Sequence, residues 1–150
     1  MEPIITSSIS HIIYPVKNLD EAIEFYTQNL GFKVLRRYGS GRGRDSAYLE
    51  LGGVLLEMGE NPNAAPARAD GRLENRIGLT VKDLDACVEL LKSRGVEMED
   101  EPYEARTFWG RQCKIKDPSG YSVTLREWKA PDGPTFAGWQ PRHEGTIRTG

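Results

Sequence analysis

The sequence is poor in the residues that build disulfide frameworks and metal clusters. Its 150 residues hold two cysteines, Cys87 and Cys113, and two histidines, His11 and His143. The two cysteines lack the close spacing of a metal motif, and two cysteines are too few for a disulfide-stapled fold. We therefore expect both to be reduced thiols of a cytoplasmic protein.

Strong net charge and long apolar runs are also missing. The formal net charge of -2 gives no drive towards nucleic acid or an anionic membrane surface. No apolar run approaches the roughly 20 residues that span a bilayer. Residues 1–10 lack the basic and apolar regions of a signal peptide. These absences predict a cytoplasmic globular domain without nucleic-acid or membrane partners.

The sequence does contain an internal repeat. Residues 11–20, HIIYPVKNLD, align with residues 76–85, RIGLTVKDLD, at an offset of 65 residues. Each copy predicts a short strand that runs into a helix, capped by Asn18 or Asp83, with Glu21 completing a capping box in the first copy. An apolar stripe at helical spacing follows in each copy. The stripes are Leu19, Ala22, Ile23, Tyr26 and Leu30, ending at Gly31, and Leu84, Cys87, Val88 and Leu91, ending at Gly95.

Three strand-like runs follow each helix. They cover residues 32–38, 46–51 and 54–58, and then residues 96–103, 108–116 and 121–128. The pattern predicts an α+β domain of two tandem βαβββ modules over residues 1–128. Module one covers about residues 9–60, a linker residues 61–73, and module two about residues 74–128. A Pro/Gly-rich tail without its own core is expected at residues 129–150.

This layout resembles the vicinal-oxygen-chelate superfamily of glyoxalases, bleomycin-resistance proteins and extradiol dioxygenases. The resemblance covers residues 9–128 and includes the strand that starts at His11, the V-x-N/D-L-D sequences and a late D-P-x-G hairpin. The Trp109-Gly110-Arg111 stretch looks most like the bleomycin-resistance branch. The resemblance implies a cupped, mostly antiparallel sheet with helices on its outer face, and a homodimer in which sheet edges find partners.

In metal-dependent relatives, four positions in the cup supply His or Glu ligands. The resemblance maps them onto His11, Glu57, Arg76 and Thr124, of which only the first two match. Arginine stays protonated and has no lone pair to donate, and threonine is a poor neutral ligand. A divalent ion about 4 Å from Arg76 would be repelled by roughly 8 kcal/mol at an effective dielectric near 20. No cofactor is therefore favoured, and a divalent Ni, Zn, Mn or Fe ion on His11 and Glu57 is the alternative.

The same face of the expected strands offers groups for binding a small organic ligand. Arg76 would anchor an anionic group through two parallel hydrogen bonds. Trp109 and Trp128 would form a stacking wall for a planar ligand, and Thr124 and Arg126 share the strand face of Trp128. A purely structural role is the alternative for these candidate residues. His11 would be a hydrogen-bonded residue at the end of a strand, and Glu57 would form an ion pair with Arg76. The tryptophans would only fill the core.

Three classes of function stay open. The favoured class is a metal-free protein that sequesters or recognises a small organic molecule, anionic or planar in character. The second is a metal-dependent lyase, isomerase or dioxygenase. The third is a metal-free enzyme in which His11 and Glu57 exchange protons with the substrate and Arg76 stabilises an oxyanion. Whether the chain is an enzyme is left undecided by the sequence.

Overall fold

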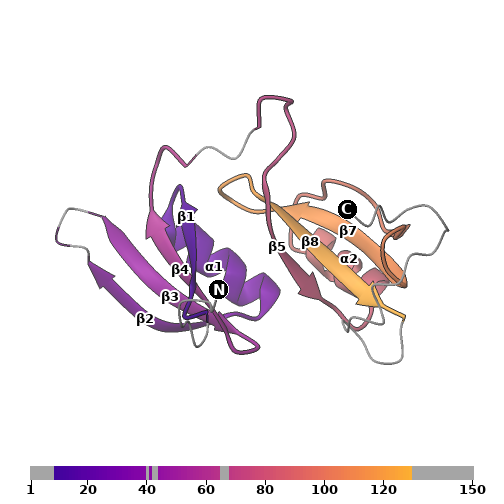
Figure 1. Cartoon of the computed structure of the whole chain (residues 1–150), viewed down its shortest axis with the longest axis horizontal. Coiled ribbons are helices and arrows are strands. Elements are labelled where there is room, and N and C mark those ends of the chain that lie inside the picture. The colour runs from indigo at the N-terminus through magenta and orange to yellow at the C-terminus, as the bar shows by residue number, and fades with distance from the viewer. Residues whose placement is uncertain (1–8, 40, 42–43, 65–67, 130–150) are drawn as a thin grey trace, which may run out of the picture. The chain divides into compact units, whose positions relative to one another are not determined.

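The computed structural model describes residues 9–39, 41, 44–64 and 68–129. The chain divides into two compact units, residues 1–65 and 66–150, and each is described by itself. Among the described residues, each unit has one α-helix and one sheet. Figure 1 shows each helix lying against the sheet of its own unit. Most of the predicted tail, with His143, lies outside the described residues.

Module one has the order strand, helix, three strands. Its elements are β1 (Ile12–Val16), α1 (Leu19–Leu30), β2 (Lys33–Gly39), β3 (Asp45–Leu51) and β4 (Val54–Glu60). The strands lie in the order β1-β4-β3-β2 (Figure 1). The β1–β4 pair is parallel and the other two pairs are antiparallel.

Module two repeats this order. Its elements are β5 (Asn75–Thr80), α2 (Leu84–Ser93), β6 (Tyr103–Glu104), β7 (Gly110–Lys116) and β8 (Ser122–Trp128). The strands lie in the order β5-β8-β7-β6, with β5 and β8 parallel. The predicted α+β fold of two tandem βαβββ modules is confirmed, with four strands in each sheet.

The helix starts follow from side chains that accept hydrogen bonds at the free N–H groups. Asn18 accepts from the Glu21 N–H at 3.0 Å, and Asp83 accepts from the Ala86 N–H at 2.9 Å. Both predicted N-caps are therefore confirmed. The first helix ends at Gly31, whose φ of 77° lies in the left-handed region that glycine adopts at little cost.

A second side chain that accepts a hydrogen bond at each helix start comes from the last strand of the same module. Glu60 in β4 accepts a hydrogen bond from the Leu19 N–H at 3.1 Å. Glu127 in β8 does the same for the Leu84 N–H at 2.8 Å. A carboxylate at a helix N-terminus also interacts favourably with the helix dipole. The repeat therefore extends from the sequence to the tertiary contacts that attach each helix to its sheet.

Each helix buries one stripe against its sheet. The buried helix residues are Leu19, Ala22, Phe25 and Tyr26 in α1, and Leu84, Val88 and Leu91 in α2. Ile23, Leu30 and Cys87 from the predicted stripes are only half-buried, and Phe25 was missed. The alternation of buried and exposed residues along β1 and β4 leaves one face of the sheet away from α1.

The predicted strand at residues 96–103 is wrong. Only an isolated bridge at Met98 and the two-residue β6 occur there. The Asp100 carboxylate accepts the hydrogen bond of the Lys114 N–H, and the Lys114 carbonyl accepts from the N–H groups of both Glu99 and Asp100. A side chain thus replaces a backbone carbonyl in the ladder, and regular pairing with β7 stops.

In the part of the chain that the structure describes, no helix is long and apolar enough to cross a membrane.

Candidate functional site

His11 and Glu57 meet on the face of the first sheet that points away from α1. Strands β1 and β4 run in parallel, with Ile13 opposite Glu57. Leu56 and Met58, on either side of Glu57, are buried under α1, so Glu57 points to the opposite face. The His11 Nε2 atom lies 2.9 Å from the Glu57 Oε2 atom. The predicted neighbourhood of these two side chains is therefore present.

Two tyrosines that the sequence analysis missed complete this group. The Tyr38 hydroxyl donates to the second carboxylate oxygen of Glu57, and this contact is the main reason that the pKa of Tyr38 rises to about 12. The Tyr48 ring meets the His11 ring edge-on at a centroid distance of 5.9 Å and stacks on Tyr38 at 5.8 Å. The pairing of β3 with β4 could have pointed to Tyr48, because it places this residue directly opposite Glu57.

Polar contacts hold the His11 ring and both carboxylate oxygens of Glu57 in place. The Ser10 Oγ atom lies 2.9 Å from His11 Nδ1, on the side of the ring away from Glu57. The exposed fractions of the His11 and Glu57 side chains are 31% and 26%, so a solute can reach them while much of their surface is covered. Such a partly covered imidazole–carboxylate pair can accept a proton from a bound molecule and return it.

The equivalent positions of module two have different chemistry. Gly78 pairs with Thr124 between β5 and β8, as Ile13 pairs with Glu57 in module one. Thr124 is buried, and its hydroxyl accepts a hydrogen bond from the Asn75 amide at 2.6 Å. The position that corresponds to Glu57 therefore holds an enclosed neutral group.

Arg76 contacts residues that the sequence analysis did not predict as its neighbours. The pairing of β5 with β8 shifts register between Asn75 and Ile77, and Arg76 lies at this irregularity. Its Nη2 atom is 3.2 Å from a Glu74 carboxylate oxygen, and its guanidinium carbon is 4.6 Å from the Tyr121 ring centroid. The predicted role of Arg76 as the anchor of an anionic ligand stays a prediction.

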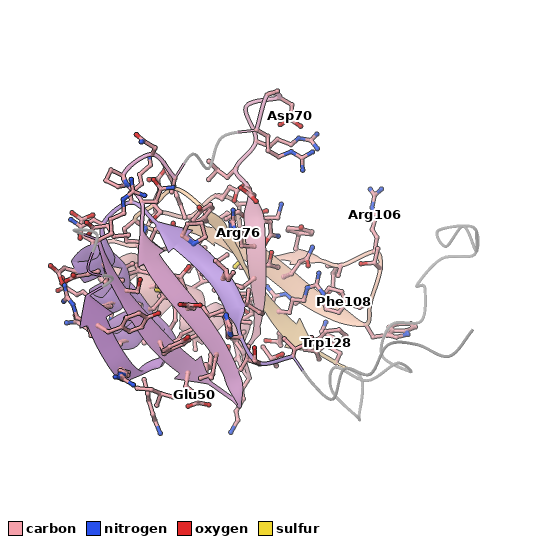
Figure 2. The ribbon with its side chains drawn as sticks, turned by 60° about the vertical axis from the view of Figure 1, so that its left-hand side comes forward. Glu50, Asp70, Arg76, Arg106, Phe108 and Trp128 are labelled. Atoms are coloured by element: carbon pink, nitrogen blue, oxygen red, sulfur yellow. The ribbon has the colours of Figure 1, made fainter. Side chains whose placement is uncertain are left out.

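The predicted ligand-binding residues of β8 meet an aromatic side chain from the loop before β7. The guanidinium carbon of Arg126 is 4.8 Å from the Phe108 ring centroid, and its Nε donates to the Gln112 side chain at 3.2 Å. Phe108 and Trp128 lie with centroids 4.5 Å apart (Figure 2). Trp109 is 45% exposed, so its indole is not part of the buried core.

The match to a family model agrees with this geometry. Residues 8–125 match the model of the Glyoxalase/Bleomycin resistance protein/Dioxygenase superfamily. The chain belongs to this superfamily.

Several known members are similar to this chain. A probable lactoylglutathione lyase of Vibrio cholerae is 30% identical over 122 residues, which are 78% of this chain and 88% of the relative. The metallothiol transferase FosB of Staphylococcus epidermidis is 36% identical over 77 residues, 51% of each chain. The crystal structure of a glyoxalase family protein from Enterococcus faecalis has a TM-score of 0.68 at 22% identity, covering 80% of this chain and 97% of that one. The plant lactoylglutathione lyases are longer, and the chain spans 35% to 42% of them.

A divalent metal, the predicted alternative cofactor, needs at least three donors in a stable catalytic site. Among the described residues of one chain, no group of three or more His, Cys, Asp or Glu side chains could hold an ion. Module one supplies the His11 nitrogen and the Glu57 oxygens, whereas the matching positions of module two hold Arg76 and the buried Thr124. The described residues of a single chain therefore supply fewer than the three donors of a stable site, and the comparisons give no support to the expected absence of a cofactor.

Proposed function

We propose that this chain is an enzyme that transfers protons to and from a small organic molecule at His11 and Glu57. The 2.9 Å contact between the imidazole and the carboxylate, on the partly open face of the first sheet, carries this proposal. The relatives add support, since they are named as lyases and transferases. Because these names describe enzymes, the comparisons give no support to the metal-free sequestering protein that the sequence analysis favoured.

The contacts indicate how this chain's own residues would act. One of His11 and Glu57 would accept a proton from the substrate, and the other would return it to a neighbouring atom. Tyr38 would keep the carboxylate oriented, because its neutral hydroxyl donates to the oxygen that does not face His11. The substrate class that fits this chemistry and the relatives' names is a small carbonyl compound or its thiol adduct.

The test is an assay of the full chain with glutathione and methylglyoxal, following S-lactoylglutathione. We expect His11→Gln and Glu57→Gln each to lower kcat by at least 100-fold, within the usual range for an acid–base residue. Glu24→Gln, the same change at an exposed position of α1, is the matched control and should keep full activity. Turnover that survives both site substitutions would show that the chemistry takes place elsewhere.

A metal-dependent enzyme is the second candidate, and one observation favours it. The His11 nitrogen and the Glu57 oxygen are 2.9 Å apart, about the separation of two ligands that bind one ion at roughly 2.1 Å each. The name of the metallothiol transferase supports it too. Elemental analysis of the purified full chain distinguishes the candidates. Near-unit occupancy that is lost in Glu57→Gln would support the metal enzyme, and an active protein without metal would support proton transfer alone.

We also propose that the chain acts as a homodimer in the cytoplasm. β1 and β5 are edge strands of their sheets, and Ile13 in β1 is 69% exposed. Light scattering should give about twice the 16.8 kDa of the chain. Ile13→Lys should lower this mass, whereas Leu90→Lys, at an exposed apolar position of α2, should leave it unchanged. A wild-type monomer at micromolar concentration would refute the dimer. Two free thiols agree with a reducing compartment.

A further inference from the structure

Strand β2 forms an open edge of the sheet of module one. The strands of this sheet lie in the order β1-β4-β3-β2, so β3 is the only described strand that pairs with β2 (Figure 1). β2 has seven residues, and all of them except the half-buried Tyr38 are exposed. An edge strand keeps backbone N–H and C=O groups that a further strand can pair with. β2 therefore offers these groups along its outer side.

Two apolar side chains lie exposed on this edge. Val34 is 42% exposed and Leu35 is 58% exposed. The register of β2 on β3 shifts between Val34 and Arg36, so Leu35 has no residue opposite it in β3. A bulge of this kind protects an edge against pairing with an arbitrary strand. A strand that does fit would cover the apolar pair and remove its surface from water.

The charges of β2 all have the same sign. Lys33, Arg36 and Arg37 are basic, and the strand contains no acidic residue. The charge of Arg37 is already compensated, because its guanidinium lies 2.5 Å from Asp20 and 3.0 Å from Asp45. Two cations of the strand, Lys33 and Arg36, therefore remain for a partner.

These two cations have no charged partner of their own. The side chain of neither Lys33 nor Arg36 has a hydrogen bond or ion pair with another described residue. Glu50 lies opposite Lys33 in β3, but its carboxylate accepts the hydrogen bond of the Gly53 N–H at 2.7 Å. One uncompensated cation therefore stands on each side of the apolar pair along the strand.

The bulge places both cations on one face of the sheet. Lys33 lies opposite Glu50, and Arg36 lies opposite Tyr48. Glu50 and Tyr48 are two residues apart in β3 and so share a face, and their partners in β2 share it too. Val34 pairs with the β3 residue between them and faces the other way. An added strand with acidic and apolar residues in alternation would match this pattern.

We propose that β2 binds an extended acidic segment of a partner protein, which joins the sheet of module one as a further strand. Backbone hydrogen bonds would hold the segment, and its carboxylates would select for the two cations. A second copy of β2 fits less well, because it would bring like charges opposite one another. This surface does not depend on the chemistry proposed for His11 and Glu57.

The first test uses the wild-type full chain and four synthetic peptides, each as long as β2. One alternates glutamate with valine, one alternates lysine with valine, one contains glutamate alone, and one is the glutamate–valine peptide with N-methyl groups on alternate amides. Calorimetry should show the unmodified glutamate–valine peptide binding at least tenfold tighter than each of the others. Equal binding of the all-glutamate peptide would indicate charge attraction alone, and equal binding of the N-methylated peptide would exclude an added strand. Either result would overturn the proposal.

Hydrogen exchange of the full chain locates the bound peptide. The glutamate–valine peptide should slow exchange of the backbone amides of residues 33–39. Slowed exchange that is confined to other residues would overturn the proposal. Slow exchange of residues 33–39 that appears without peptide and increases with protein concentration would show that a second copy occupies the edge, which would also overturn it.

The third test uses charge reversal. Lys33→Glu combined with Arg36→Glu should weaken binding of the glutamate–valine peptide at least tenfold and should strengthen binding of the lysine–valine peptide. Lys82→Glu makes the same kind of change at an exposed position of module two and should leave both affinities unchanged. Unchanged affinities in the folded double variant would overturn the proposal. If the double variant fails to fold, the peptide comparison in the wild type decides.

Discussion

At the scale of single residues, Gly110 allows β7 to approach β8 more closely than any other amino acid would. A Cβ atom at this position would lie 2.1 Å from the Glu127 carbonyl oxygen and 2.8 Å from the Phe108 ring. Neither neighbour can give way easily, since one is backbone and the other is a fully buried ring. Gly110 therefore maintains the close approach of β7 and β8, across which Arg126 donates to Gln112.

We predict that Gly110→Ala lowers the free energy of unfolding by about 1–3 kcal/mol or more, the usual cost of overpacking a tight site. Gly78→Ala is the control in the same sheet, because the nearest atom to an added Cβ there is 3.9 Å away. Urea denaturation of both variants measures the difference. Equal midpoints for the two variants would contradict the predicted clash.

Cys113 offers a prediction about pH. Burial raises the pKa of the Cys113 thiol to about 12, above its ordinary value of 9.0. The folded protein thus holds this proton more tightly than the unfolded chain does. The thiol's contribution to stability is fully present below pH 9 and falls as the pH rises from about 9 towards 12. Cys113→Ala should flatten this alkaline decline in urea titrations.

Reactivity gives an independent check on the same thiol. At pH 8 iodoacetamide should label the half-buried Cys87 slowly and leave Cys113 unmodified, because the thiolate is the reacting species. Labelling in guanidinium chloride should modify both residues and serves as the control. Rapid modification of Cys113 in the folded protein, measured by peptide mass spectrometry, would show that it is not buried as described.

At the scale of elements, each module attaches its helix to its sheet in the same way. A side chain caps the helix start, and a glutamate from the last strand accepts a hydrogen bond from the N–H of the first helical residue. We predict that Asn18→Ala and Asp83→Ala each reduce stability by about 1 kcal/mol, as expected for the loss of an N-cap. Lys82→Ala changes an exposed neighbour and should have little effect. Denaturation midpoints for the three variants test this, and an unaffected Asn18→Ala would show that Glu60 alone suffices.

At the scale of the whole molecule, a four-ligand metal site needs donors from both modules. Thr124 has the same register position in module two as Glu57 has in module one. We predict that Arg76→His with Thr124→Glu binds Zn²⁺ at least tenfold more tightly than the wild type, and more tightly than either single variant. The reason is that the pair replaces a cation by an imidazole and adds a second carboxylate. Calorimetry that finds no gain in the double variant would show that the four positions do not converge.

The sequence by itself determined the features that depend on neighbours in the chain. The capping residues and Gly31 set the helix boundaries, because they satisfy or end hydrogen bonds within one turn. Strand alternation placed Glu57 on the face opposite Leu56 and Met58, because successive side chains point to opposite faces. The repeat indicated the tandem modules for the same reason, since each copy repeats the same local signals.

Only the tertiary structure decided which side chains meet across strands. Tyr38 reached Glu57, and Phe108 reached Arg126, through contacts between segments far apart in the chain. Arg76 lies at the register shift in β5 and contacts Tyr121. The Asp100 side chain interrupts the strand that was expected at residues 96–103. A register shift or a side chain that enters a ladder depends on the partner strand, and periodicity within one segment holds no information about it.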